Sequence, residues 1–311
     1  MTNKFAAVSQ NWARFVVTGA DGFIGQHLVC FLRAHGLAVV GVDRRSGSTV
    51  NEVMDIRRPG VLDPLLGDTT VLFHLAGSAD VRESVAGPVS DFEENVVTAI
   101  HVLESVRSAG GCIVFPSTGS VYDQAAPLPP TERAPVRPSS PYAAAKVAVE
   151  AYCQAYHRSY GLDARVARIS STFGPGMRRF AIHDFVERLE RNPHRLVLWG
   201  DGGQTRDYLY VEDLVRAFHL IAVSGAPGEV YNVASGHSRT IRQVAEGVLH
   251  AMGLRDCEVT VDGRNSDAEA YRMEMDISKL QQIGFRPTAI FEEALATTVA
   301  WLRSNRPQET V

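Results

Sequence analysis

The stretch TGADGFIG, residues 18–25, lies between a short β-branched run and a longer helical pattern. The run before it is Phe15–Thr18, the pattern after it spans Phe23–Ala34, and a second strand-like run, Leu37–Asp43, follows. A strand, a helix and a strand within about thirty residues are typical of a parallel unit with a right-handed crossover. The stretch therefore predicts an α/β fold with a parallel sheet.

The same stretch has the composition of a phosphate-binding turn. Gly19, Gly22 and Gly25 permit a tight turn, a close approach of the backbone to a pyrophosphate and tight packing of the helix. Free N–H groups at the helix start, at Phe23 and Ile24, attract phosphate charge. Taken alone, glycines at this spacing are as typical of a plain strand-to-helix turn.

Asp43 ends the second strand-like run and favours a dinucleotide. A carboxylate at this place accepts hydrogen bonds from an adenosine ribose and repels a 2′-phosphate. We therefore predict NAD as the cofactor. Arg44 and Arg45 are cations next to it, so NADP stays open.

The rest of the chain continues the alternation and then changes character. Three more apolar runs are separated by enough residues for helices: Val71–Leu75, Cys112–Phe115 and Ala164–Ile169. The clearest helical patterns are Phe92–Val106 and Tyr142–Tyr160, which together with these runs predict a doubly wound sheet. Beyond Ile169 the pattern loosens, and the strand-like runs there are Arg195–Trp199 and Glu229–Val233. We expect a large domain of residues 1–169 with a return segment at about 207–233, and a smaller C-terminal α/β substrate-binding domain of residues 170–206 and 234–311.

Composition excludes several classes of protein. The chain has 311 residues, 45% of them hydrophobic and 21% charged, which fits one large domain or two intimate ones. A net charge of -4 without a basic stripe argues against nucleic acid. No apolar run is long enough for a membrane span, and the start lacks the pattern of a signal peptide, so we expect a cytoplasmic protein with no membrane partner. The four cysteines form no close pair, and we expect no metal site.

Tyr142 and Lys146 lie four residues apart in SPYAAAK, residues 140–146, and so on one face of a helix. An ammonium beside a phenol stabilises the phenolate and lowers the pKa of the tyrosine from its usual value of about 10. This would make Tyr142 a general acid/base. The alternative is a surface helix with a chance pair, which three lysines in the chain make rare.

A cluster of hydroxyl residues follows the run Cys112–Phe115. Ser117, Thr118 and Ser120 lie where a parallel strand ends, which is where ligands bind in such sheets. A hydroxyl there can point at a reacting oxygen. By itself such a cluster is usually only a turn.

The glycine turn, the hydroxyl cluster and the Tyr142–Lys146 pair occur in the order and at the distances of one known family. Over essentially its whole length the chain resembles the extended short-chain dehydrogenases, also called the NAD-dependent epimerase/dehydratase family. Further matching stretches are His74-Leu75-Ala76-Gly77, Asn95 ahead of a helix, Arg168 through Phe173-Gly174-Pro175, Gly200 through Tyr208, Val211-Glu212-Asp213, Tyr231-Asn232, and Arg272 ahead of Asp276 through Lys279. The resemblance implies a Rossmann-type NAD-binding domain, a nucleotide-sugar-binding domain and a nucleotide-diphosphate sugar as substrate.

The resemblance also assigns roles to single positions. It implies a catalytic triad of Thr118, Tyr142 and Lys146. The cofactor contacts that it implies, besides the glycine turn, Asp43, Tyr142 and Lys146, are Asp55, Ile56, Leu75, Ala76, Gly77 and Asn95. The substrate contacts that it implies are Thr118, Ser120, Ser171, Arg178, Arg206 and Arg272. Arg206 and Arg272 resemble a pair that clamps a diphosphate, a task that suits the planar guanidinium, with surface ion pairing as the alternative.

Within the family, residues after the hydroxyl strand select the reaction. Dehydratases and decarboxylating members usually carry acidic residues where this chain has Gly119 and Ser120. Without a carboxylate there, the simplest outcome is that hydride returns to the other face of a transient 4-keto sugar, which is 4-epimerisation. The stretch from Gly174 to Pro193, with the Gly-Asp-Gly motif that begins at Gly200, most resembles the UDP-glucose 4-epimerases.

Other readings stay open. This chain has Ser171 where the family usually has an Asn. Glucuronate 4-epimerases also have a hydroxyl residue there and an arginine near Arg178, so UDP-glucuronate 4-epimerase is an alternative. Another NDP-sugar dehydratase or reductase of the family is a further alternative. A cofactor-sensing regulator would be expected to have lost Tyr142 or Lys146. A ketone reductase acting on a non-nucleotide substrate would not use Arg206 and Arg272. We expect a homodimer, because the helices Phe92–Val106 and Tyr142–Tyr160 resemble those that pair in the family, although the same faces also suit a monomer core.

Overall fold

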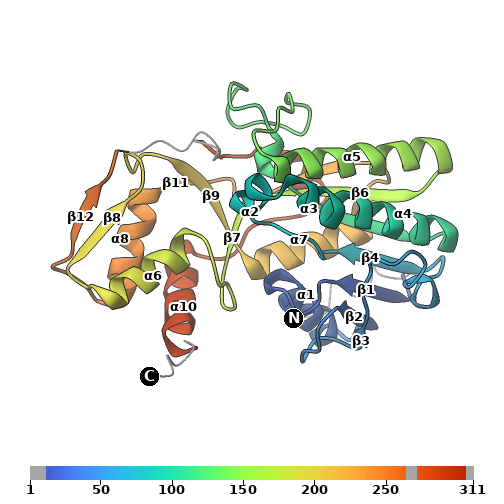
Figure 1. Cartoon of the computed structure of the whole chain (residues 1–311), viewed down its shortest axis with the longest axis horizontal. Helices are drawn as coiled ribbons and strands as arrows, with labels where there is room; N and C mark the ends of the chain where they lie inside the picture. The colour runs from blue at the N-terminus through green and yellow to red at the C-terminus, as the bar shows by residue number, and fades with distance from the viewer. Residues whose placement is uncertain (1–11, 264–271, 306–311) are drawn as a thin grey trace.

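The computed structural model describes residues 12–263 and 272–305, and its main feature is a seven-stranded parallel sheet (Figure 1). The strand order is β10-β6-β5-β4-β1-β2-β3, in which the chain starts near the middle and winds outward in both directions. The strands are β1 (Arg14–Thr18), β2 (Val39–Asp43), β3 (Glu52–Val53), β4 (Thr70–His74), β5 (Cys112–Thr118), β6 (Asp163–Ile169) and β10 (Val230–Val233). This is the doubly wound, Rossmann-type sheet that the sequence predicts.

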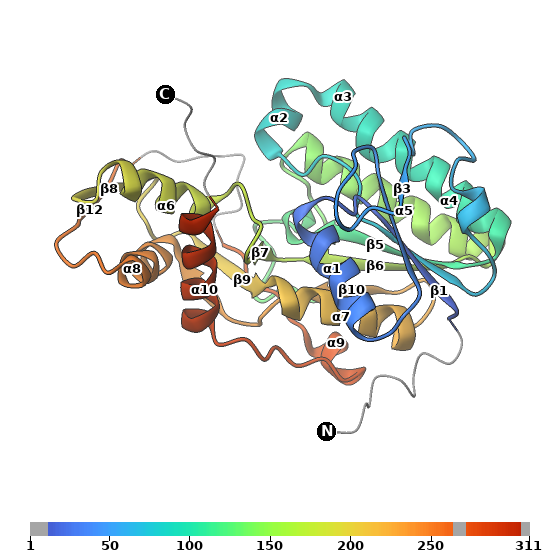
Figure 2. The same cartoon turned by 90° about the horizontal axis from the view of Figure 1, so that it is seen from below.

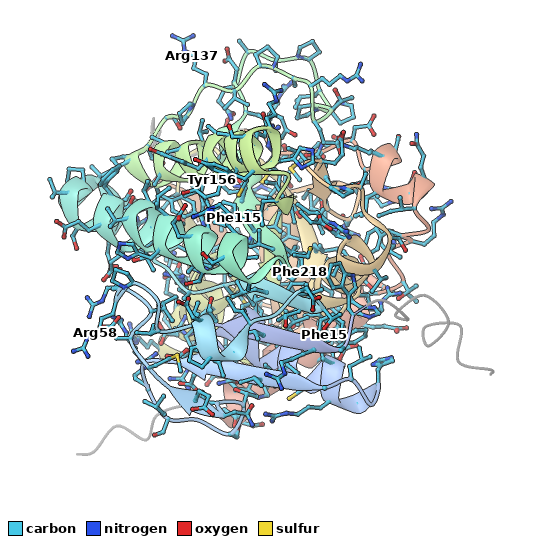
Figure 3. The ribbon with its side chains drawn as sticks, turned by 90° about the vertical axis from the view of Figure 1, so that its right-hand side faces the viewer. Phe15, Arg58, Phe115, Arg137, Tyr156 and Phe218 are labelled. Atoms are coloured by element: carbon cyan, nitrogen blue, oxygen red, sulfur yellow. The ribbon has the colours of Figure 1, made fainter. Side chains whose placement is uncertain are left out.

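Helices cover both faces of this sheet (Figures 1 and 2). On one face α1 (Phe23–Ala34) and α7 (Val211–Ser224) pack together, and on the other α4 (Thr98–Ala109) lies beside α5 (Pro141–Tyr160). Each face has its own apolar core. Figure 3 shows the division: Phe15 and Phe218 belong to the core under α1 and α7, whereas Phe115 and Tyr156 belong to the core under α4 and α5.

The predicted helix Phe92–Val106 has a more complex form than the sequence indicated. It consists of α3 (Pro88–Phe92), a π-helical turn over Glu93–Val97 and then α4. Asn95, predicted to lie ahead of a helix, is inside the π-helical turn. Such turns insert one residue into a helix and are frequent at functional sites. By contrast, α1 has the predicted bounds.

A smaller part of the chain carries two short sheets. One has the order β11-β9-β7 and the other pairs β12 with β8. Its elements are β7 (Ser171–Phe173), α6 (Ala181–Arg191), β8 (Arg195–Leu198), β9 (Thr205–Tyr210), β11 (Ser238–Thr240), α8 (Ile241–Met252), β12 (Glu258–Val261) and α10 (Phe291–Ser304). Strand β9 crosses the predicted boundary at about 207, while α7 and β10 return to the large sheet. In the described residues, no helix has the length and apolar character to cross a membrane.

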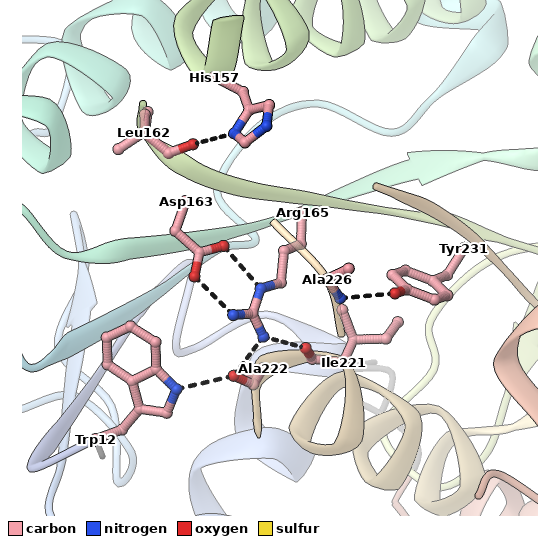
Figure 4. A network of polar contacts seen from close by, with 9 residues as sticks. All are labelled: Trp12, His157, Leu162, Asp163, Arg165, Ile221, Ala222, Ala226 and Tyr231. Atoms are coloured by element: carbon pink, nitrogen blue, oxygen red, sulfur yellow. Dashed lines mark hydrogen bonds and ion pairs between the residues drawn. The ribbon is translucent and has the colours of Figure 1, made fainter. Parts of the chain in front are cut away.

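A buried arginine joins β6 to the end of α7 (Figure 4). Arg165 makes a two-fold ion pair with Asp163 and donates hydrogen bonds to the carbonyls of Ile221 and Ala222 at 2.6 and 2.7 Å. A cation at the carbonyl end of a helix is favourable, and the same two carbonyls also accept hydrogen bonds from the amide of Gly225 and from Nε1 of Trp12. The contact therefore anchors α7 against the sheet.

Candidate active site

The glycine turn between β1 and α1 is built by close contact of main-chain atoms. Gly19 has a φ of +70°, and a Cβ there would lie 2.7 Å from the amide nitrogen of Ala76. A Cβ on Gly25 would lie 2.0 Å from the carbonyl oxygen of Gly19. The start of α1, after Gly22, has no side chain that caps it. The turn thus fits the pyrophosphate of a dinucleotide. No side chain caps the N–H groups at the start of α1, and the glycines carry no side chain that would keep a phosphate from the backbone.

Asp43 lies at the end of β2, next to this turn. Its carboxylate accepts hydrogen bonds from the amides of Asp21, at 3.1 Å, and Arg45, at 3.2 Å. These bonds fix the carboxylate where a ribose would lie. The side chains of Arg44 and Arg45 are exposed.

Asp55 and Ile56, both expected near the adenine, have different surroundings. Arg57 donates hydrogen bonds to both carboxylate oxygens of Asp55, and this lowers the pKa of that carboxyl to about 2. Ile56 is buried in the core under α4 and α5. Its buried position gives it a packing role in addition to any cofactor contact.

The segment Leu75–Gly77 follows β4 and lies against the glycine turn. The hydroxyl of Thr18 is hydrogen-bonded to Nδ1 of His74 at 3.0 Å and accepts a bond from the amide of Ala76 at 3.3 Å. A Cβ on Gly77 would lie 2.6 Å from Oδ1 of Asn95. The structure therefore brings this segment, the glycine turn and Asn95 together.

Tyr142 and Lys146 lie in the first turns of α5, and both are buried. Ser140 caps the helix by accepting a hydrogen bond from the amide of Ala143, and Ser84 accepts one from the amide of Tyr142. The Nζ atom of Lys146 lies 5.7 Å from the centre of the Tyr142 ring and donates to the carbonyl of Pro116 at 3.1 Å. The two groups are therefore neighbours without a direct bond between them.

The expected lowering of the Tyr142 pKa is wrong for this state of the protein. Burial raises the pKa of Tyr142 to about 12, although a hydrogen bond with Thr118 and the charge of Arg179 act in the opposite direction. Burial also lowers the pKa of Lys146 to about 8. The cost of removing a phenolate from water thus outweighs the help from nearby cations.

The turn after β5 brings hydroxyl groups and methionines together. Thr118 is almost fully buried, and its hydroxyl accepts a hydrogen bond from the amide of Ser120 at 3.2 Å. A Cβ on Gly119 would lie 2.6 Å from Sδ of Met275 and 3.5 Å from Sδ of Met273. Two thioethers therefore cover the position where dehydratases carry an acidic residue.

Apart from Thr118 and Ser120, which lie at the end of β5, the predicted substrate residues lie on several segments of the smaller part. Ser171 begins β7, in register with Tyr208 of β9, and Arg206 is on β9. An isolated bridge pairs Thr205 with Arg272, so the two predicted phosphate-binding arginines lie on neighbouring backbone segments. Arg178 is exposed in the loop before α6.

Sequence reasoning missed Arg179, the neighbour of Arg178. Its charge, and not that of Arg178, acts on the pKa of Tyr142. It also pairs with Asp80, at 3.8 Å. Two adjacent arginines in a loop without periodicity give no signal that would choose between them.

The short helix α2 (Val81–Ala86) contacts both the smaller part and α5, the helix that carries Tyr142 and Lys146. Its Arg82 stacks over the ring of Trp199 at 4.6 Å, and Asp80, which caps it, is the residue that pairs with Arg179. Ser84, in the same helix, holds the amide of Tyr142. The contacts with Trp199 and with Tyr142 are thus made by residues of the same short helix, α2.

Comparison with known proteins places the chain in a family. Residues 15–234 match the model of the NAD dependent epimerase/dehydratase family. A UDP-glucose 4-epimerase from Mycolicibacterium smegmatis is 32% identical, covering 94% of this chain and 99% of that protein. A dTDP-glucose 4,6-dehydratase from Streptomyces antibioticus is 30% identical, covering 94% and 92%.

A solved structure gives the same result. The UDP-glucose 4-epimerase of Thermus thermophilus, in complex with NAD, superposes with a TM-score of 0.82 and 32% identity, covering 93% of this chain and 99% of that chain. These matches confirm the predicted family, fold class and cofactor. The chain belongs to the NAD-dependent epimerase/dehydratase family.

Proposed function

We propose that this chain is a nucleotide-sugar 4-epimerase of the UDP-glucose/UDP-galactose type that works through a transient 4-keto sugar. The observation that carries the proposal is the turn after Thr118. Gly119 and Ser120 supply no carboxylate for an elimination, and Met273 and Met275 pack over Gly119. With no acid/base there to divert it, a 4-keto sugar takes back its hydride.

The chain's own residues supply the proton chemistry and the positioning. NAD, when bound, would accept hydride from carbon 4 and return it. Tyr142 takes the proton of the 4-hydroxyl as the phenolate, whose charge the ammonium of Lys146 stabilises, and gives the proton back as the phenol. Thr118, which lowers the pKa of Tyr142, holds the same oxygen. Arg206 and Arg272 hold the diphosphate, so that the sugar has the freedom to turn its other face to the cofactor.

Sequence identity does not choose between the family's reactions. The 4-epimerases and the dehydratase differ from this chain to nearly the same degree. The family resemblance offers a finer criterion, because dehydratases usually carry acidic residues in the turn after β5, where this chain has Gly119 and Ser120. For this reason the proposal rests on Gly119 rather than on overall likeness.

A second candidate is UDP-glucuronate 4-epimerase. Ser171 is smaller than the usual Asn, and the adjacent cations Arg178 and Arg179 lie in the loop before α6, where the charge of Arg179 reaches Tyr142. A substrate carboxylate would pair with such cations. The proposed reaction is the same, and only the group at carbon 5 differs.

One experiment tests these proposals together. The purified protein is incubated with UDP-, GDP-, CDP- and dTDP-sugars, including UDP-glucose and UDP-glucuronate, and the anomeric protons are followed by NMR. Appearance of a carbon-4 epimer of unchanged mass supports epimerisation and names the sugar. A product lighter by one water would contradict it in favour of dehydration, and net oxidation or reduction would contradict it in favour of a reductase.

We also propose that the domains divide this work as predicted. Residues 1–169, with the return segment, would bind NAD, because they hold the glycine turn and Asp43. Residues 170–206 and 234–311 would bind the nucleotide sugar, because they carry Ser171, Arg206 and Arg272. The described structure refines one boundary, since β9 belongs to the smaller part as far as Tyr210.

A homodimer is a further proposal, supported by an exposed apolar surface on α2, α3, α5 and the π-helical turn. The surface consists of Val85, Val89, Phe92, Val97, Tyr152 and Tyr160, with Val89 70% exposed and Phe92 52% exposed. The helices that carry these side chains pack on one another, and exposed apolar side chains that gather in this way mark protein contacts. Light scattering should give the mass of two chains, and Phe92→Glu should give that of one; a monomeric wild type would overturn the proposal.

A further inference from the structure

Asp91 is a buried carboxylate close to Tyr142 and Lys146. We propose that Asp91 is a positioning residue, which holds Asn95 by a hydrogen bond and provides the negative charge that keeps Lys146 in its ammonium form. The proposal deepens the proposed function, because it rests on Lys146 acting as an ammonium in the acid/base step. Asp91 is not catalytic in this account, since it acts through Asn95 and Lys146.

The first argument is the incomplete hydrogen bonding of Asp91. Asp91 is the second-last residue of α3, and it is only 5% exposed. Its Oδ1 accepts a hydrogen bond from Nδ2 of Asn95 at 3.0 Å, whereas its Oδ2 is buried and has no hydrogen-bond partner among the described residues. A buried carboxylate with one unbonded oxygen is costly unless a cation lies nearby.

Lys146 is that cation. Burial raises the pKa of the Asp91 carboxyl and lowers that of Lys146 to about 8, and the attraction between the two charges acts against burial on both. The positions agree with this, since α3 packs directly on α5. Asp91 also faces Tyr142, whose pKa its charge raises.

The second carboxylate near Lys146 is already paired. Glu150 makes a two-fold ion pair with Arg168, with one contact of 2.6 Å, and accepts a hydrogen bond from Ser117. Its charge still supports the ammonium, but the guanidinium offsets most of it. Asp91 is hydrogen-bonded only to a neutral amide, so its charge remains for Lys146.

The other ionisable groups around this pair do not take over its role. His74, on β4, is held neutral by burial, and the charge of Lys146 lowers the pKa of His74 further. Glu94, in the π-helical turn, acts on Asp91 as a like charge. Arg179, from the loop before α6, is a cation that acts on Tyr142. Among the residues that the structure describes, Asp91 and Glu150 are therefore the two that support the charge of Lys146.

The geometry links the same carboxylate to the cofactor contacts. Asn95 is held on one side by Asp91 and lies on the other against Gly77, in the segment expected to touch NAD. The π-helical turn begins two residues after Asp91 and contains Asn95. One side chain thus sets the place of an expected cofactor contact and the charge of the lysine beside the phenol.

The test uses Asp91→Asn, which removes the charge and keeps the oxygen that accepts from Asn95. The chain has three lysines, Lys4, Lys146 and Lys279, so protein labelled with ¹³C-lysine gives few signals to titrate by NMR. Lys146→Arg assigns the signal of interest. Lys279, which contacts Glu229 at 2.6 Å, serves as the internal reference for an intact fold.

We expect the pKa of Lys146 to fall by about one unit or more in NAD-loaded Asp91→Asn, while that of Lys279 stays the same. Glu93→Gln is the matched control, because it removes an equal charge from an exposed residue two positions along and should leave both values unchanged. An unchanged Lys146 titration in Asp91→Asn overturns the proposal. If that variant loses its fold, Asp91→Ser is the second neutral variant for the same titration.

Turnover gives an independent reading. Deprotonation of Lys146 at lower pH should move the alkaline limb of the pH–rate profile of Asp91→Asn to lower pH, which a merely structural loss of activity would not do. A limb at the wild-type position contradicts the proposal. If the wild type converts no nucleotide sugar, the proposed function fails, and the lysine titration still decides the role of Asp91.

Discussion

The glycine turn and the arginine-bearing segments would hold their proposed ligands, NAD and the sugar nucleotide, in different ways. At the glycine turn, main-chain atoms lie so close together that a methyl group has no space at Gly19 or at Gly25. The opposite side works through long side chains, among which Arg178 and Arg272 are exposed. Under the proposed function, binding of NAD would therefore depend on steric fit at the glycine turn, whereas binding of the sugar nucleotide would depend on charged side chains, which are more easily exchanged.

The largest expected effect falls between the two regions, at Tyr142. Tyr142→Phe removes the proton acceptor and leaves both binding regions intact, so turnover should fall by roughly a thousandfold while NAD binding persists. NMR of the sugar products and calorimetry with NAD measure the two quantities. Tyr152→Phe, on the exposed side of the same helix, is the control and should behave as wild type. Full activity of Tyr142→Phe would remove the phenol from the mechanism.

The next effect tests the steric half of the comparison. Gly25→Ala should cost about 2–3 kcal/mol of unfolding free energy and should weaken NAD binding, because the new methyl group would meet the carbonyl of Gly19. Urea denaturation measures the cost. In Gly67→Ala the added carbon meets nothing closer than 3.8 Å, so this variant should be nearly neutral. Equal stability of the two variants would show that the turn has more freedom than its geometry indicates.

A smaller effect is expected at the arginines. Arg206→Ala or Arg272→Ala should raise KM for the nucleotide sugar by about tenfold, because each removes a charge-assisted hydrogen bond to phosphate, and should leave NAD affinity unchanged. Steady-state kinetics and NAD titration separate the two. Arg303→Ala, which loses only an ion pair with Glu190, provides the comparison. A loss of NAD affinity in the arginine variants would contradict the division between the two regions.

The smallest effect at pH 7 is that of two buried histidines, whose influence on stability grows as the pH falls. Burial lowers the pKa of His74 to about 3 and that of His219 to about 4, from an ordinary value of 6.5. The unfolded chain binds these protons first, so stability is complete above pH 6.5 and falls as the pH drops toward 3, by about 1.4 kcal/mol per unit for each group at most. Denaturation at several pH values measures the slope. His74→Gln should flatten it, and an unchanged slope would assign it to other groups.

The steric half was also the more predictable from sequence. The glycine spacing and the strand before it predicted α1 with its observed bounds, because local constraints on the turn determine where the helix starts. The proximity of Thr118 to Tyr142 and Lys146 was predictable as well, because Thr118 ends a strand of the parallel sheet and the other two lie in the first turns of the helix that follows it. Such features depend on neighbours in the chain or on the rules of sheet topology.

The features that sequence did not predict depend on packing between distant segments. The π-helical turn at Asn95, the raised pKa of Tyr142 and the cover of Met275 on Gly119 all arise from tertiary contacts. The choice of Arg179 over Arg178 has the same origin. Burial and contact of this kind leave no periodic trace in the residues themselves.

Helix α2 gives the comparison a mechanical aspect. Because Arg82 and Asp80 touch the smaller part while Ser84 holds the amide of Tyr142, a rotation of that part about the sheet would be transmitted to the base of the phenol. Capture of a sugar nucleotide and alignment of the proton acceptor would then be one movement rather than two. The accuracy of the chemistry would in that case be set partly by a helix of six residues.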